Sequence, residues 1–174
     1  RQDRPHAVYL TSVVVGPFAE VRESTEGLSV AYWVQPGDEE TAARCLADTP
    51  EMIALFEQAY ATPYPWARYD QVLVPRFRFG GMENAGAIFY SDQAITRGTL
   101  SEGTVAHEIA HQWFGNAVTP ARWADVWLSE GFATYFGALY FEHADGTERF
   151  RQMVDNSSAG YLRSQVTNLA IVDT

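Results

Sequence analysis

The fold of this chain is decided by the stretch His107-Glu108-Ile109-Ala110-His111-Gln112-Trp113-Phe114-Gly115-Asn116. The preceding Thr99-Leu100-Ser101-Glu102 has the form of a capping box and Gly115 is a natural stop, which together predict a helix. Residues four apart share one face of a helix, so the imidazoles of His107 and His111 can converge on one metal ion. Glu108 is rotated about 100° from His107 and should lie beside the ion rather than bind it.

A third ligand is expected on the next helix, because zinc sites that do chemistry use three protein ligands and leave one position open. Trp127-Leu128-Ser129-Glu130-Gly131 should belong to that helix. We therefore predict that His107, His111 and Glu130 bind one Zn²⁺ per chain. Glu108 is the predicted catalytic base. The alternative is that the two histidines are only a structural pair on one helix face.

The rest of the chain reads as strands followed by helices, which predicts an α+β domain with the metal between two helices. Strands are expected at 7–15, 18–22, 28–34, 69–74 and 86–90. Helices are expected at about 38–48, from Thr49 to the stop at Thr62-Pro63, from near Asp125 or Ser129 to about His143, and over much of 148–165.

The composition narrows the range of partners. The net charge is −10, with the acidic residues spread along the chain, so a phosphate backbone would be repelled and nucleic acid is an unexpected partner. No apolar run approaches the roughly 20 residues that a membrane span needs. Hydrophobic residues make up 47% of the chain, which indicates a globular protein, and the single Cys45 excludes an internal disulfide.

Two motifs resemble those of the aminopeptidase N family of gluzincin zinc aminopeptidases. The first combines the stretch 107–116 with Val118-Thr119 and with 127–133. The second, Gly80-Gly81-Met82-Glu83-Asn84, looks like the exopeptidase motif G-x-M-E-N of that family. Its double glycine is the form found in the leukotriene-epoxide hydrolase relatives. The resemblance covers about residues 63–145.

This resemblance implies a thermolysin-like zinc peptidase catalytic domain that removes single amino acids from peptide N-termini. It implies that Glu83 binds the free α-amine of the peptide and that the adjacent glycine backbone lines the peptide's path. The predicted substrate-binding residues are Gly80, Gly81, Met82, Glu83 and Asn84. An ammonium buried beside a metal needs a paired carboxylate, which agrees with that role for Glu83. The alternatives are that Gly80-Gly81 is a plain turn and that Glu83 is a solvated loop carboxylate.

The resemblance also suggests how the chain is divided. Residues 1–34 resemble the end of an N-terminal β-sheet domain with its lead-in strands, and 35–174 resemble the catalytic domain, truncated at its C-terminal end. The family's oxyanion tyrosine and a second amine-binding carboxylate are both expected outside the chain. We therefore expect a fragment of a longer protein that has flanking domains as partners and is weakly active or inactive alone.

The predicted function is thus a zinc aminopeptidase acting on peptides with a free N-terminus. Three alternatives stay open. A thermolysin-like endopeptidase would not need Glu83 in its motif. An epoxide hydrolase with aminopeptidase activity is compatible with Gly80-Gly81. A zinc-binding module without chemistry would usually have a broken ligand set, whereas all four key residues are present here.

Overall fold

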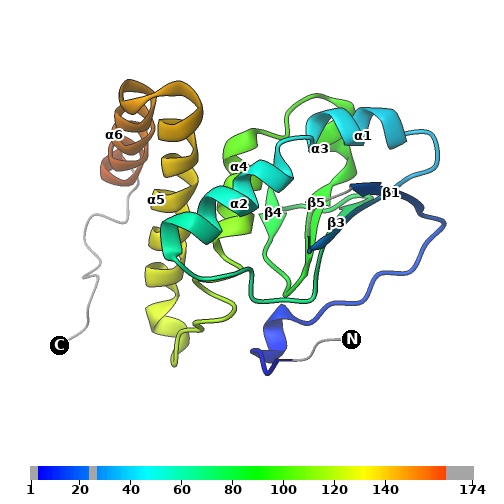
Figure 1. The fold of residues 1–174 in the computed structure, drawn as a ribbon, viewed down its shortest axis with the longest axis horizontal. Helices are drawn as coiled ribbons and strands as arrows, with labels where there is room; N and C mark the ends of the chain where they lie inside the picture. The colour runs from blue at the N-terminus through cyan, green and yellow to red at the C-terminus, as the bar shows by residue number, and fades with distance from the viewer. Residues whose placement is uncertain (1–3, 24–26, 164–174) are drawn as a thin grey trace.

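The computed structural model describes residues 4–23 and 27–163, which form a five-stranded sheet followed by a group of helices (Figure 1). The strands are β1 (Ala19–Glu23), β2 (Ser29–Val34), β3 (Arg68–Val74), β4 (Gly81–Met82) and β5 (Ala87–Ser91). The helices are α1 (Glu39–Cys45), α2 (Thr49–Tyr60), α3 (Asp92–Thr96), α4 (Glu102–Ala110), α5 (Val126–Asp145) and α6 (Thr147–Arg163), with short 3₁₀ turns η1 (Val8–Leu10) and η2 (Trp123–Asp125). The expected α+β class is confirmed, and the thermolysin-like arrangement stays a prediction.

The sheet has the strand order β1-β2-β3-β5-β4. The inner pairs β2–β3 and β3–β5 are parallel, whereas β1–β2 and β4–β5 are antiparallel. Parallel neighbours need a crossover connection, and α1 and α2 supply it between β2 and β3. The inner strands carry apolar and aromatic side chains that are fully buried, as is typical of strands covered on both faces: Val30, Tyr32, Tyr69, Leu73, Ile88 and Tyr90.

The sheet continues across the predicted domain boundary at residue 34. Strand β2 ends at Val34 and pairs in parallel with β3, which lies well inside the second predicted domain. Residues on both sides of the boundary therefore share one sheet. The division into two domains itself stays a prediction.

The helical part places α4 between the sheet and α5, and α6 packs on the far side of α5 (Figure 1). An aromatic cluster joins α2 to this group: the ring centroid of Tyr60 lies 5.1 Å from that of Trp113, 5.2 Å from Phe114 and 4.6 Å from Phe136. Edge-to-face contacts of this kind add to the burial of apolar area. Within the part of the chain that the structure describes, no helix is both long and apolar enough to span a membrane.

The strand expected at 7–15 is wrong. Residues 8–10 form the turn η1, and nothing else in that stretch is regular. Val8, Val13 and Val15 are between 86% and 91% exposed, so the valines gain no burial in a sheet. A preference for strands reflects packing on a half-buried pleated surface, and this segment pairs with no strand in the described residues. The sequence reading also missed the two-residue strand β4 and the short helix α3.

Helix ends also differ from expectation. The cap of α4 is Ser101 rather than Thr99: the Ser101 Oγ accepts a hydrogen bond from the Thr104 amide at 3.1 Å. Thr49, expected to cap α2, is the first residue of that helix and follows the cap residue Asp48; its hydroxyl accepts a hydrogen bond from the buried Gln71 amide at 2.9 Å. The Thr49 hydroxyl is therefore used in a buried hydrogen bond to Gln71 of β3 rather than in capping the helix.

The close approach of α4 and α5 depends on a glycine. Gly137 of α5 is buried against α4, and a Cβ added there would lie 3.2 Å from the backbone nitrogen of His107 and 3.4 Å from its Cα. Both contacts involve backbone atoms, which cannot rotate away as a side chain can. A methyl group at this position would therefore push the two helices apart.

We predict that Gly137→Ala and Gly131→Ala affect the metal-free chain in different ways. Both positions lie in α5, where alanine is favoured over glycine by about 1 kcal/mol. A Cβ at Gly131 meets nothing within 4 Å, so that change should raise the free energy of unfolding. Gly137→Ala should fall at least about 1 kcal/mol below it, because the gain is offset by overpacking. Equal free energies of unfolding in urea titrations would show that α4 and α5 are not tightly apposed.

Candidate metal centre

The end of α4 presents two imidazoles to one point. The Nε2 atoms of His107 and His111 lie 3.0 Å apart. The Nδ1 of His111 lies 3.0 Å from the carbonyl oxygen of Phe114, which holds the ring with its Nε2 toward His107. In metal sites such a carbonyl contact at one ring nitrogen fixes the tautomer and leaves the other nitrogen free to bind.

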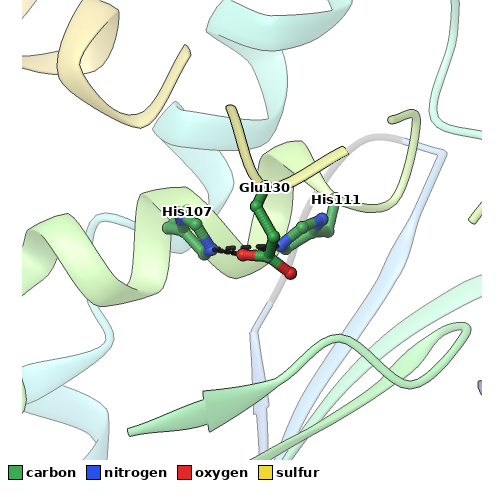
Figure 2. A group of neighbouring side chains, drawn as sticks. All are labelled: His107, His111 and Glu130. Atoms are coloured by element: carbon green, nitrogen blue, oxygen red, sulfur yellow. Dashed lines mark hydrogen bonds and ion pairs between the residues drawn. The ribbon is translucent and has the colours of Figure 1, made fainter. Parts of the chain in front are cut away.

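Glu130 reaches the same point from the start of α5 (Figure 2). Its Oε2 lies 3.3 Å from the Nε2 of His107 and 3.6 Å from the Nε2 of His111. The hydrogen bond from His107, and to a smaller extent the one from His111, holds the pKa of Glu130 well below its usual range, so this carboxylate is ionised. The Glu130 side chain is half exposed, which leaves one side of the cluster open.

These three donor atoms fit a zinc-sized cation. Ligand atoms placed tetrahedrally around zinc at about 2.1 Å lie roughly 3.4 Å from one another. The measured separations are 3.0, 3.3 and 3.6 Å. Imidazole nitrogen and carboxylate oxygen are also donor types that zinc accepts. The three residues could therefore hold one zinc ion without a large movement of either helix.

His111 is surrounded by negative charge. Burial by itself lowers the pKa of His111, but the hydrogen bond with Glu130 and the charges of Glu83, Glu130 and Glu108 outweigh it, so the net shift is upward. Two groups of three residues have ligand atoms within 4.8 Å of one another in the described part of the chain. One is His107, His111 and Glu130, and the other is Glu83, Glu108 and His111. Because three carboxylates lie around only two imidazoles, this region favours the binding of a cation.

Glu108 is buried beside this cluster, with only 6% of its surface exposed. Burial raises the pKa of Glu108 to about 8. The charge of His111 opposes this shift, and the charges of Glu83 and Glu130 add to it to a smaller extent. A carboxylate in that range can both accept and release a proton near neutral pH. Its Oε2 has no hydrogen-bond partner among the described residues.

Gly81 on β4 is what makes room for Glu108. A Cβ at position 81 would overlap the carboxylate of Glu108, so any other residue here would displace that side chain. The motif Gly80–Asn84 and the stretch 107–116, far apart in sequence, thus meet at Glu108. The sequence predicted a role for Gly81 along the peptide's path, and this contact with Glu108 is an additional one.

Glu83 is 8% exposed and is held by two amides from the stretch after α4. Its carbonyl oxygen accepts a hydrogen bond from Asn116 Nδ2 at 2.6 Å and another from Gln112 Nε2 at 3.3 Å. Gln112 Oε1 in turn accepts the amide of Gly86 at 3.1 Å. These bonds fix the loop that carries Glu83 relative to the histidines. No role was predicted for Gln112 or Asn116, although both are polar residues in the stretch 107–116 that carries the two histidines.

The remaining residues of the exopeptidase-like motif lie at the edge of the sheet. Gly81 pairs with Tyr90 and Met82 with Phe89, while the other side of β4 pairs with no strand in the described part of the chain. Gly80 is exposed. Asn84 is buried, and its Nδ2 has no hydrogen-bond partner among the described residues. An unpaired edge of this kind exposes main-chain groups to which an extended peptide can bond.

Comparison with known proteins places this site in a family. Residues 45–169 match the Peptidase family M1 domain. Aminopeptidase M1-B of Oryza sativa subsp. japonica is 36% identical over 165 residues, which is 88% of this chain and 19% of the relative. Aminopeptidase N of Mus musculus is 34% identical over 160 residues, covering 85% of this chain and 17% of the relative. Glutamyl aminopeptidase of Sus scrofa is 34% identical over 160 residues, covering 86% and 17%.

The chain spans less than a fifth of the length of these relatives. The family match nevertheless covers well over half of the chain and includes the segments that carry the histidines, Glu83, Glu108 and Glu130. The relatives match most of the chain at more than 30% identity. We conclude that this chain belongs to peptidase family M1, the metallopeptidases that include the aminopeptidases named above.

Proposed function

We propose that the protein is a zinc metallo-aminopeptidase, which releases single amino acids from the N-terminus of peptides. The observation that carries this proposal is the meeting of His107, His111 and Glu130 within 3.0 to 3.6 Å, directly beside the buried carboxylates of Glu108 and Glu83. Membership of family M1 and the aminopeptidase names of the reported relatives support the same reaction.

His107, His111 and Glu130 hold one zinc ion in this proposal, through two Nε2 atoms and one carboxylate oxygen. When bound there, zinc polarises the scissile carbonyl and makes the attacking water more acidic. The ionised Glu130 supplies the negative charge that a divalent cation requires. The contact of His111 with the Phe114 carbonyl keeps the second imidazole in the orientation needed for binding.

Glu108 acts as the general base. It takes a proton from the attacking water and then passes it to the amine that leaves. Its burial supports this role, because burial raises the pKa of Glu108 to about 8, so that this carboxylate readily holds a proton near neutral pH. Gly81 keeps the carboxylate in place by leaving space for it.

Glu83 sets the register of the peptide. Its carboxylate pairs with the α-ammonium of the substrate, so that the first peptide bond, and no later one, reaches the metal. Gln112 and Asn116 hold the Glu83 backbone and so fix the distance between this pair and the histidines. The peptide lies along the edge that Gly81 and Met82 form in β4, and Gly80 and Asn84 flank this edge in the substrate-binding motif.

The alternatives are less well supported. An endopeptidase does not need to bind a free α-amine, so it would not require a buried carboxylate such as Glu83 next to the metal ligands. The reported relatives carry aminopeptidase names, which favours this reaction over epoxide hydrolysis. A module that only binds zinc would not require Glu108 to be buried beside the ligands. The flanking domains stay part of the proposal, as do the oxyanion tyrosine and the second amine-binding carboxylate that are expected outside the chain.

We predict that Glu108→Gln in the full-length protein retains zinc and loses most of its turnover. Loss of a general base lowers kcat by about 10²–10⁴-fold, whereas the three ligands are unchanged. Glu102→Gln is the matched control, because Glu102 is an exposed carboxylate on the same helix, and kcat should be unaffected. Steady-state kinetics at equal zinc content, measured by atomic absorption, provide the test. A Glu108→Gln enzyme with near-normal kcat would exclude the assigned role.

We predict that Glu83→Gln harms substrates with a free amine far more than substrates whose amine is blocked. A hydrogen bond to a charged group contributes about 1.5–3 kcal/mol, so kcat/KM for an aminoacyl fluorogenic substrate should fall about ten- to a hundredfold. The N-acetylated form of the same substrate, which the unaltered enzyme should cleave poorly, should change little. Equal losses on the two substrates would reduce Glu83 to a structural role.

A further inference from the structure

Tyr9 lies between the loop that carries Glu83 and the helix that carries Glu130. The carbonyl oxygen of the adjacent Leu10 accepts a hydrogen bond from the amide of Ala85 at 3.2 Å, which ties η1 to the end of the Glu83 motif. The ring of Tyr9 meets Trp123 edge-to-face, with the centroids 5.4 Å apart. Trp123 belongs to η2, which leads directly into α5. Two independent contacts therefore hold this phenol beside the proposed site.

The hydroxyl of Tyr9 is shielded from solvent and has no hydrogen-bond partner among the described residues. Buried hydroxyls are nearly always paired, so an unpaired one beside a proposed binding site requires an explanation. Burial, followed by the charges of Glu83 and Glu130, raises the pKa of Tyr9 and so keeps the phenol neutral. A neutral phenol can donate one hydrogen bond and accept another.

We propose that Tyr9 is a further substrate-binding residue whose hydroxyl oxygen accepts a hydrogen bond from the α-ammonium group that Glu83 pairs with. This inference rests on the proposed aminopeptidase function. An ammonium has three N–H donors, and a single carboxylate does not satisfy all of them. The Tyr9 O–H can in turn donate to the carboxylate of Glu83 or Glu130. The hydroxyl, which has no partner in the described part of the chain, thus gains one when the peptide binds.

Two inhibitors that differ only in the amine separate this role from others. Leucine hydroxamic acid carries the α-ammonium, and 4-methylpentanehydroxamic acid is the same molecule without it. Both have the metal-binding hydroxamate. Calorimetry on the zinc-loaded full-length protein should show that Tyr9→Phe weakens binding of the first about tenfold or more, as expected for a lost hydrogen bond to a charged group. Binding of the second should be unchanged.

Tyr60→Phe is the matched control. Tyr60 also has a buried hydroxyl with no partner among the described residues, but it is the last residue of α2 and packs in the aromatic cluster with Trp113. Removal of this hydroxyl should leave both affinities unchanged. Neither replacement should lower the melting temperature, since neither hydroxyl has a hydrogen-bond partner among residues 4–23 and 27–163.

Several results would overturn the inference. If Tyr9→Phe weakens both inhibitors equally, or neither of them, Tyr9 does not bind the amine. A clear fall in the melting temperature of Tyr9→Phe would give the hydroxyl a structural role instead. Failure of both inhibitors to bind the unaltered, zinc-loaded protein is a different outcome, because it would contradict the proposed function itself and this inference with it.

Discussion

The contact between α4 and α5 is the constraint on which the rest of the site depends. His107 and His111 come from one helix and Glu130 from the other, and their donor atoms meet within 3.6 Å only because the helices lie close together. Gly137 permits that closeness, since its missing side chain leaves room for the backbone of His107. The geometry of the proposed metal centre is therefore a property of helix packing as much as of the ligands.

Electrostatics gives the same region its chemical character. Glu83, Glu108 and Glu130 gather around His107 and His111, and two of the three carboxylates are buried. Such a concentration of negative charge is costly in the absence of a counter-charge. A divalent cation at the histidines and an ammonium at Glu83 would offset it from two sides. The arrangement thus favours a positively charged ligand next to a metal, as an aminopeptidase requires.

Much of the fold and of the candidate site could be predicted from local sequence. The spacing of His107 and His111, the Ser101 region and the apolar run of α5 each contain their own structural signal. The strand expected at 7–15 failed because its valines carry strand preference but have no neighbour to pack on. Likewise, Gln112 and Asn116 gained their significance only from tertiary contacts with the Glu83 loop, and Tyr9 from its contact with Trp123, which no local pattern encodes.

The central claim is that His107, His111 and Glu130 together hold one zinc ion. Anomalous diffraction from zinc-loaded crystals, recorded on both sides of the zinc absorption edge, tests it most directly. The account predicts one strong peak per chain, at about 2.0–2.2 Å from the Nε2 atoms of both histidines and from a carboxylate oxygen of Glu130. A peak held instead by Glu83, Glu108 and His111, the other group whose ligand atoms lie within 4.8 Å, would contradict it, because Glu108 would then be a ligand and not a base.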